Sequence, residues 1–108
     1  MTSVTLPFVG GSKTSTGKAG LFGYVFGGSE QTGATKTRQY TESNHYSSNT
    51  YDNYIPSLLN KVTITNASQI SYGAFYNCSN IITLRINSSV KNNVAGEAFV
   101  NCIEPTYY

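Results

Sequence analysis

A hexapeptide that occurs twice limits what this chain can fold into. GAFYNC at residues 73–78 returns as EAFVNC at residues 97–102. A short alternating segment precedes each copy, VTI at residues 62–64 and LRI at residues 84–86. Self-similarity with a period of roughly 20–50 residues is the signature of a chain that stacks similar units. The repeat therefore predicts at least two stacked coils.

Each unit has the pattern of a short strand that needs a neighbour. Apolar and polar residues alternate, so Val62 and Ile64 point to one side, as do Leu84 and Ile86. One short strand cannot bury this side, whereas two coils stacked in parallel can. We expect the Ala-Phe pair to close each coil on the far side and each Cys to pack as a small buried hydrophobe. The asparagine before each Cys is expected to serve the backbone groups of a buried turn.

The segment from residue 58 to residue 102 resembles the BspA-like leucine-rich repeat, whose pattern runs approximately L-x-x-I-x-I-P-x-x-V-x-x-I-G-x-x-A-F-x-x-C. The proline that this pattern places after the strand is Thr65 in one copy and Asn87 in the other. The resemblance implies a leucine-rich-repeat solenoid of the α/β class, rich in strand and with little helix. It would have about three short coils, with a small parallel sheet on one face. It also implies a bacterial cell-surface protein that attaches to host, matrix or other-cell proteins.

The first part of the chain fits a degenerate coil. SVTLPFVG at residues 3–10 carries the same alternation, and in GLFGYVFGGSE we expect Val25, Phe26 and Ser29 to replace Ala, Phe and Cys. The prediction is one domain of residues 1–108, with a degenerate first coil (3–29), a polar Tyr-rich insert (30–55), a second coil (56–78), a third coil (79–102) and a tail (103–108). The expected core consists of Val4, Leu6, Phe26, Val62, Ile64, Ile70, Ala74, Phe75, Cys78, Leu84, Ile86, Val94, Ala98, Phe99 and Cys102.

The insert at residues 30–55 is not explained by any repeat. It combines four tyrosines with Ser, Thr and Asn. This composition is typical of a solvated loop, but also of binding loops, in which Tyr provides rigid amphipathic contact area. The alternation of Tyr with polar residues also allows an extra hairpin at the edge of the solenoid. We expect partner contacts here and on a second patch of the sheet, at Arg38, Tyr40, Tyr46, Tyr51, Tyr54, Thr63 and Arg85.

Several catalytic motifs fail on inspection. GGSKTSTGKAG at residues 10–20 lacks the first Gly of a P-loop and the Ser or Thr after Lys18. His45 is the single histidine, and no Gly-x-Ser-x-Gly context accompanies it and Asp52. Two Cys, one His and five carboxylates give little material for a metal site. We therefore expect no enzyme, no cofactor and no metal.

Composition and the start of the chain limit which classes of partner and which cellular compartments we expect. A net charge of +2 with 11% charged residues is too weak a bias to indicate nucleic acid. No apolar run is long enough to predict a transmembrane helix, so no membrane insertion is expected. The start of the chain lacks the pattern of a signal peptide, so the protein either stays inside or is a piece of a longer exported chain. One Cys per coil favours free thiols over a bridge.

Two functional hypotheses remain from the sequence. The first is a non-enzymatic interaction or adhesion module, which is extracellular or at the cell surface by the family resemblance and binds other proteins. The second is a self-assembling structural subunit that binds copies of itself, because coil ends without polar caps favour end-to-end stacking. An enzyme is a distant third.

Overall fold

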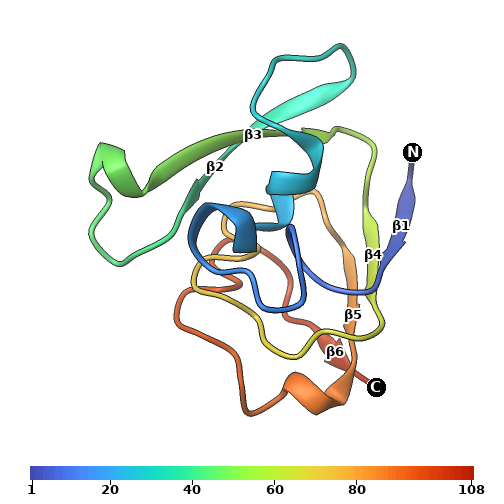
Figure 1. The fold of residues 1–108 in the computed structure, drawn as a ribbon. Coiled ribbons are helices and arrows are strands. Elements are labelled where there is room, and N and C mark those ends of the chain that lie inside the picture. Colours follow the sequence, from blue (N-terminus) through green and yellow to red (C-terminus); the bar gives the residue numbers. More distant parts are fainter.

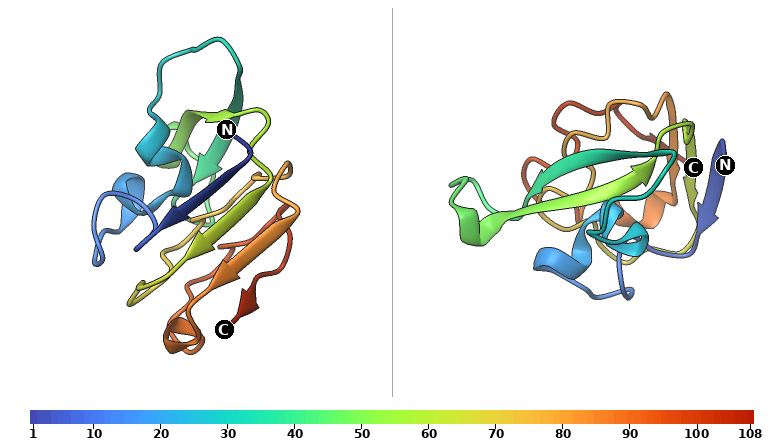
Figure 2. Two further views of the ribbon diagram at one scale, coloured as in Figure 1. Left: turned by 90° about the vertical axis from the view of Figure 1, so that its right-hand side faces the viewer. Right: turned by 90° about the horizontal axis from the view of Figure 1, so that it is seen from above.

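The computed structural model describes residues 1–108, and its main element is a parallel sheet (Figure 1). Its strands, in spatial order, are β1 (Ser3–Leu6), β4 (Lys61–Ile64), β5 (Thr83–Ile86) and β6 (Thr106–Tyr107). All three pairings are parallel. The left view of Figure 2 shows the four strands following one another in the order of the chain, from β1 to β6.

The register of the sheet aligns the alternating residues of successive segments. Val62 lies opposite both Val4 and Leu84, and the next inward row places Ile64 opposite Ile86. Val62, Ile64 and Ile86 are fully buried. The small parallel sheet and the pairing of VTI with LRI are therefore confirmed. β-branched residues favour these strands because they pack well on a pleated, half-buried surface.

The helical content is limited to short 3-10 turns. They are η1 (Gly17–Gly20), η2 (Phe22–Phe26), η3 (Ser47–Asn49) and η4 (Ser88–Val90). The prediction of a β-rich fold with little helix is confirmed. None of these turns has the length and apolar character that a membrane crossing requires.

Three phenylalanines, Phe22, Phe75 and Phe99, stack on one another in the core. The ring of Phe75 stacks on Phe22 at 4.9 Å and on Phe99 at 5.7 Å between centroids. The backbone repeats the same contact, because Phe22 N donates to Ala74 O and Phe75 N donates to Ala98 O, both at 2.7 Å.

The prediction that Phe26 holds the Phe position of the first coil is wrong. Phe22 occupies it, because the Phe22 amide is the one that reaches the next coil. Phe26 ends η2 instead, and meets Phe22 edge-on at 5.4 Å. Val25, expected in the Ala position, is 45% exposed, and Ser29 is also exposed.

The core has a buried centre and half-buried ends. Among the residues expected in it, Val62, Ile64, Ile70, Ala74, Phe75, Cys78, Leu84, Ile86 and Ala98 are buried. Val4, Leu6, Phe26, Val94, Phe99 and Cys102 are partly buried and pack against these. The partly buried residues lie mostly on the edge strand β1 or within residues 79–102.

The insert forms an antiparallel hairpin of β2 (Ala34–Tyr40) and β3 (Thr50–Pro56). Figure 2 shows the hairpin toward the β1 end of the stack. Its inner face buries Thr37, Gln39, Asn53 and Ile55. Its outer face carries Lys36, Arg38, Asp52 and Tyr54. The hairpin therefore has a buried polar face and a solvent-facing charged and aromatic face.

Candidate functional site

The hairpin is joined to the coils by one buried glutamine. Gln39 is fully buried, and its Nε2 donates to Ala74 O at 3.1 Å and Tyr76 O at 3.2 Å. Its Oε1 accepts from Gly23 N at 3.1 Å and from Asn53 Nδ2 at 3.2 Å. Every polar atom of the side chain is thus satisfied, as burial requires. The loop-proximal half of the hairpin is thus fixed both to η2 and to residues 74–76.

The outer face of the hairpin holds a small charged group. Arg38 contacts Asp52 through two bonds, Nε to Oδ1 at 3.0 Å and Nη2 to Oδ2 at 3.3 Å. Lys36 Nζ lies 3.7 Å from Asp52 Oδ2. The hydrogen bond from Arg38 holds the pKa of Asp52 below its usual value and raises the pKa of Arg38. The side chains of Lys36 and Arg38 are more than half exposed, so these ion pairs contribute little to stability and both cations remain available to a partner.

An aromatic group lies at the far end of β2. Tyr40 stacks on His45 at 3.7 Å and meets Tyr76 edge-on at 4.8 Å. Near it, Tyr72 donates a hydrogen bond to Glu97, which raises the pKa of Tyr72 to about 12. Burial raises the pKa of Tyr76. Both phenols are protonated at neutral pH, as an ordinary tyrosine is, and the raised pKa values extend this to higher pH.

The structure divides the predicted contact residues between two places. Arg38, Tyr40, Tyr46, Tyr51 and Tyr54 all lie on the hairpin or its connecting loop. Tyr46 is the most accessible, with 69% of its surface exposed, whereas Tyr40, Tyr51 and Tyr54 are partly buried.

Tyr51 differs from the other tyrosines because it faces inward. It is paired with Gln39 across the hairpin, and Lys18 Nζ lies 5.5 Å from its ring centroid. Its hydroxyl donates to Ser48 O at 3.3 Å. Part of the Tyr51 side chain is therefore committed to packing within the chain.

The second predicted patch lies on the parallel sheet. Thr63 and Arg85 are direct neighbours on its outer face. The Arg85 guanidinium lies 4.6 Å from the ring centroid of Tyr108. The sequence therefore placed these two residues together, on a surface formed by different strands from those of the hairpin.

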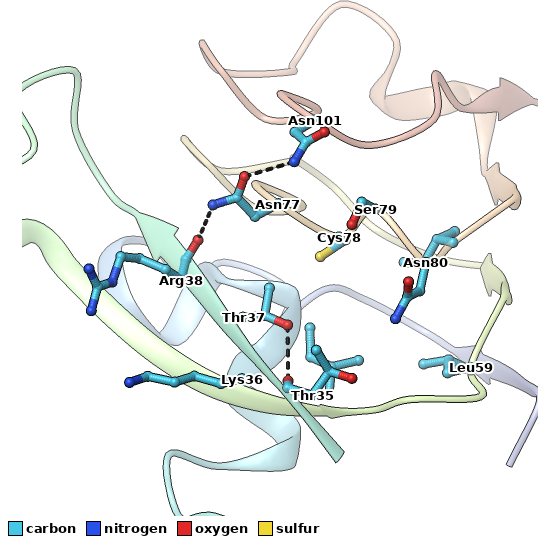
Figure 3. A pocket seen from close by; sticks show the side chains of 12 residues that line it. Thr35, Lys36, Thr37, Arg38, Leu59, Asn77, Cys78, Ser79, Asn80 and Asn101 are labelled. Atoms are coloured by element: carbon cyan, nitrogen blue, oxygen red, sulfur yellow. Dashed lines mark hydrogen bonds between the residues drawn. The ribbon is translucent and has the colours of Figure 1, made fainter. Parts of the chain in front are cut away.

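A cavity of about 330 Å³ separates β2 from the turns of the last two coils (Figure 3). Asn77 Nδ2 donates to Arg38 O at 2.7 Å, and Asn101 Nδ2 donates to Asn77 Oδ1 at 3.2 Å. Both asparagines have positive φ, 61° and 53°, a conformation that Asn tolerates better than most residues. The expectation that each asparagine serves the backbone of its own buried turn is wrong, because the Asn77 amide bonds to the hairpin and the exposed Asn101 amide bonds to the Asn77 side chain.

The thiols are placed for packing. Cys78 and Cys102 are both free, and Cys78 is buried at the cavity. Burial raises the pKa of Cys78 well above its usual value and that of Cys102 to about 11. A thiol with so high a pKa carries little thiolate at neutral pH and is a poor nucleophile.

The site residues that sequence reasoning missed are mostly polar and buried. Gln39 and Asn53 stand in a Ser- and Thr-rich segment that indicates a solvated loop. Inward-facing residues alternate with outward-facing ones along both strands. Because most of the inward residues are polar, the sequence shows no apolar–polar alternation that would identify them.

No group of three or more His, Cys, Asp or Glu side chains is placed to hold a metal ion. The hairpin and the cavity beside it present amides, hydroxyls, phenols and the Lys36–Arg38–Asp52 group, which can make contacts and hydrogen bonds with a partner. Comparison with protein-family models, with curated proteins and with solved structures finds no match to this chain.

Proposed function

We propose that this chain is a short leucine-rich-repeat solenoid of the BspA-like type that acts as a non-enzymatic protein-interaction module. The repeated Ala-Phe-x-Asn-Cys segments and the in-register parallel strands support the solenoid. The family resemblance alone supports a location at a bacterial cell surface or outside the cell. It also supports adhesion to host, matrix or other-cell proteins as the role.

The observation that carries the proposal is the two-faced hairpin. Its inner face is fixed by Gln39, so the outer face is presented on a rigid base. That outer face offers Arg38 and Tyr54, with Tyr46 exposed on the loop. Interface energy concentrates in Tyr, Trp and Arg residues, and a preformed surface loses less entropy on binding.

The test is binding to an array of matrix and host-surface proteins by the wild-type chain and a Tyr46→Ser/Tyr54→Ser variant. We expect the variant to lose at least about tenfold in affinity, as loss of hot-spot contacts implies. Its stability should change by less than about 1 kcal/mol, because these rings are exposed or half-exposed. Tyr24→Ser is the matched control, since Tyr24 is 40% exposed but lies on η2. Equal binding by both variants and the wild type would refute a hairpin interface.

Self-assembly is the second candidate, and the ends of the parallel sheet favour it. β1 and β6 are edge strands, and edge strands can pair with another chain. Near the β6 end Val100 is 38% exposed and Ile103 is 41% exposed. Size-exclusion chromatography and electron microscopy at micromolar concentration distinguish the two candidates. Filaments that disappear in Ile103→Lys would support assembly, whereas a monomer at all concentrations would exclude it.

A further inference from the structure

The free edge of β2 presents backbone groups to the cavity. Hydrogen-bonded pairs alternate along an antiparallel hairpin. Ser57 N donates to Gly33 O and Thr41 N donates to Asn49 O, so odd-numbered residues of β2 face β3. The N–H and C=O groups of Lys36 and Arg38 therefore point the other way, to the edge that lines the cavity.

This edge already accepts one bond of the kind an added strand would make. Asn77 Nδ2 donates to Arg38 O at 2.7 Å, so an amide donor fits there, and an added strand would share this oxygen or take the place of the Asn77 amide (Figure 3). Among the backbone groups of Lys36 and Arg38 that face this edge, Arg38 O alone has a partner within the chain.

The far wall of the cavity suits the rest of an extended peptide. Asn80 and Ser79 contribute amide and hydroxyl groups there, while Leu59 and Ile81 provide buried apolar surface. In an extended strand alternate side chains point to opposite faces. One set would enter the cavity, and the other would lie beside Lys36 and Arg38 on the outer face.

Charge selects among the possible occupants of the edge. If β2 of a second copy paired with this edge, Lys36 and Arg38 would meet the same cations across the ladder. Like charges directly opposite are destabilising, and lysine on an edge strand is a known protection against self-pairing. The side chains of Lys36 and Arg38 are 57% and 54% exposed, and Asp52 balances only one of the two charges. An acidic strand is therefore favoured over a second copy.

We propose that the cavity beside β2 binds an extended peptide by strand addition to Lys36 and Arg38, with acidic residues alternating with small apolar ones. This rests on the proposed interaction function and names its partner class. Main-chain bonds to the edge supply affinity, and the alternating side chains supply specificity.

The probe is the labelled peptide acetyl-Ser-Glu-Val-Glu-Val-Glu-Ser-amide, titrated into the full chain by fluorescence polarisation. Amide shifts in heteronuclear NMR locate the contact. We expect saturable binding, with the largest shifts at Lys36 and Arg38. The same peptide with Lys in place of Glu should bind at least about tenfold more weakly. Equal affinity for both peptides, or the largest shifts elsewhere, would overturn the proposal.

Methylation of peptide nitrogens tests strand addition on the wild-type protein. Only every second N–H of an added strand faces β2, so N-methylation of one set should abolish binding and N-methylation of the other should be tolerated. Tolerance of both sets, or loss with both, would overturn the proposal.

Lys36→Pro and Lys36→Ala form a matched pair of variants. Both remove the charge, but only proline removes the N–H that faces the edge, and edge strands accept proline. We expect Lys36→Pro to bind at least about fivefold more weakly than Lys36→Ala. If the acidic peptide does not bind but the array proteins do, strand addition is refuted and the proposed interaction function is not. If the peptide binds but no array protein depends on Tyr46 and Tyr54, the hairpin interface is refuted and strand addition is not.

Discussion

Replacement of Gln39 should be the most damaging change to a polar residue in this chain. Gln39→Leu keeps the size of the side chain but removes its donors and its acceptor. Tyr76 O, Gly23 N and Asn53 Nδ2 then lose their bonds to it. Ala74 O keeps one partner, because Phe22 N also donates to it, whereas Tyr76 O keeps only a weak contact from Cys78 Sγ at 3.8 Å.

The magnitude follows from those three groups. A buried polar group left without a partner costs about 1–3 kcal/mol. Three such groups cost about 3–5 kcal/mol after allowing for water that enters at the hairpin edge and for the apolar surface that leucine buries. A small domain has only about 5–15 kcal/mol of stability. At about 4–8 °C per kcal/mol, the melting temperature should fall by at least about 12 °C.

Gln39→Glu adds a test whose sign depends on pH. The introduced carboxyl is buried and faces two carbonyl oxygens, so its pKa in the folded state should lie above its unfolded value of about 4.3. Its contribution is then most favourable below about pH 4 and is lost as the pH rises through the folded pKa. The variant should melt at a higher temperature at pH 5 than at pH 7.5. In the wild type, the lowered pKa of Asp52 acts in the opposite direction, because that stability is lost as the pH falls.

Thermal melts by circular dichroism and urea titrations measure both variants, with Gln31→Leu and Gln31→Glu as exposed controls. The controls should remain within about 0.5 kcal/mol of the wild type. If Gln39→Leu has the same melting temperature as the wild type, the hydrogen bonds of the Gln39 side chain do not hold the hairpin to the rest of the chain.

Three further predictions concern the repeats. Phe75→Ala should lower the free energy of unfolding by about 3–5 kcal/mol, and Phe99→Ala by less because Phe99 is only partly buried; equal losses in urea titrations would contradict the stack. Native alkylation at pH 8, followed by mass spectrometry, should modify Cys102 before Cys78, because Cys78 is buried whereas Cys102 is partly accessible; a gain of two hydrogens on reduction would instead reveal a disulfide. Glu97→Gly should raise stability by about 0.5–1 kcal/mol by relieving a φ of 53°, whereas Glu97→Ala, which loses the same side chain without that relief, should not.

The parallel sheet could be predicted from the sequence because its signal is local and repeated. Val62 and Ile64 alternate with polar residues, and the same pattern returns at Leu84 and Ile86. The observed register places these pairs side by side. Phe22 was not predicted, because LFGYVF contains two phenylalanines and neither follows an alanine. The stacking on Phe75 and the backbone bond to Ala74 O distinguish Phe22 from Phe26.

The first residue differs between the two hexapeptides, glycine in one and glutamate in the other, and the structure explains the difference. Gly73 and Glu97 occupy the same place in successive repeats and both have positive φ. A Cβ added to Gly73 would lie 1.8 Å from Tyr40 O, so the hairpin excludes any side chain there. Glu97 has no hairpin above it. The glycine in GAFYNC therefore marks where the hairpin meets the second coil, but the sequence alone does not identify that neighbour.

The hairpin and residues 3–29 together bond to residues 56–78 much as residues 56–78 bond to residues 79–102. Asn77 N donates to Val100 O, whereas Tyr76 O, one repeat earlier, receives the side chain of Gln39. A side-chain amide has thus replaced a backbone amide at the junction. Because this bond uses the inner face of β2 alone, the outer-face side chains of Lys36 and Arg38 stay more than half exposed, whereas Tyr40 packs on His45 and Tyr76. Changes at Lys36 and Arg38 can therefore alter what the hairpin binds with little effect on the stability of the fold, which is the property that an interaction surface requires.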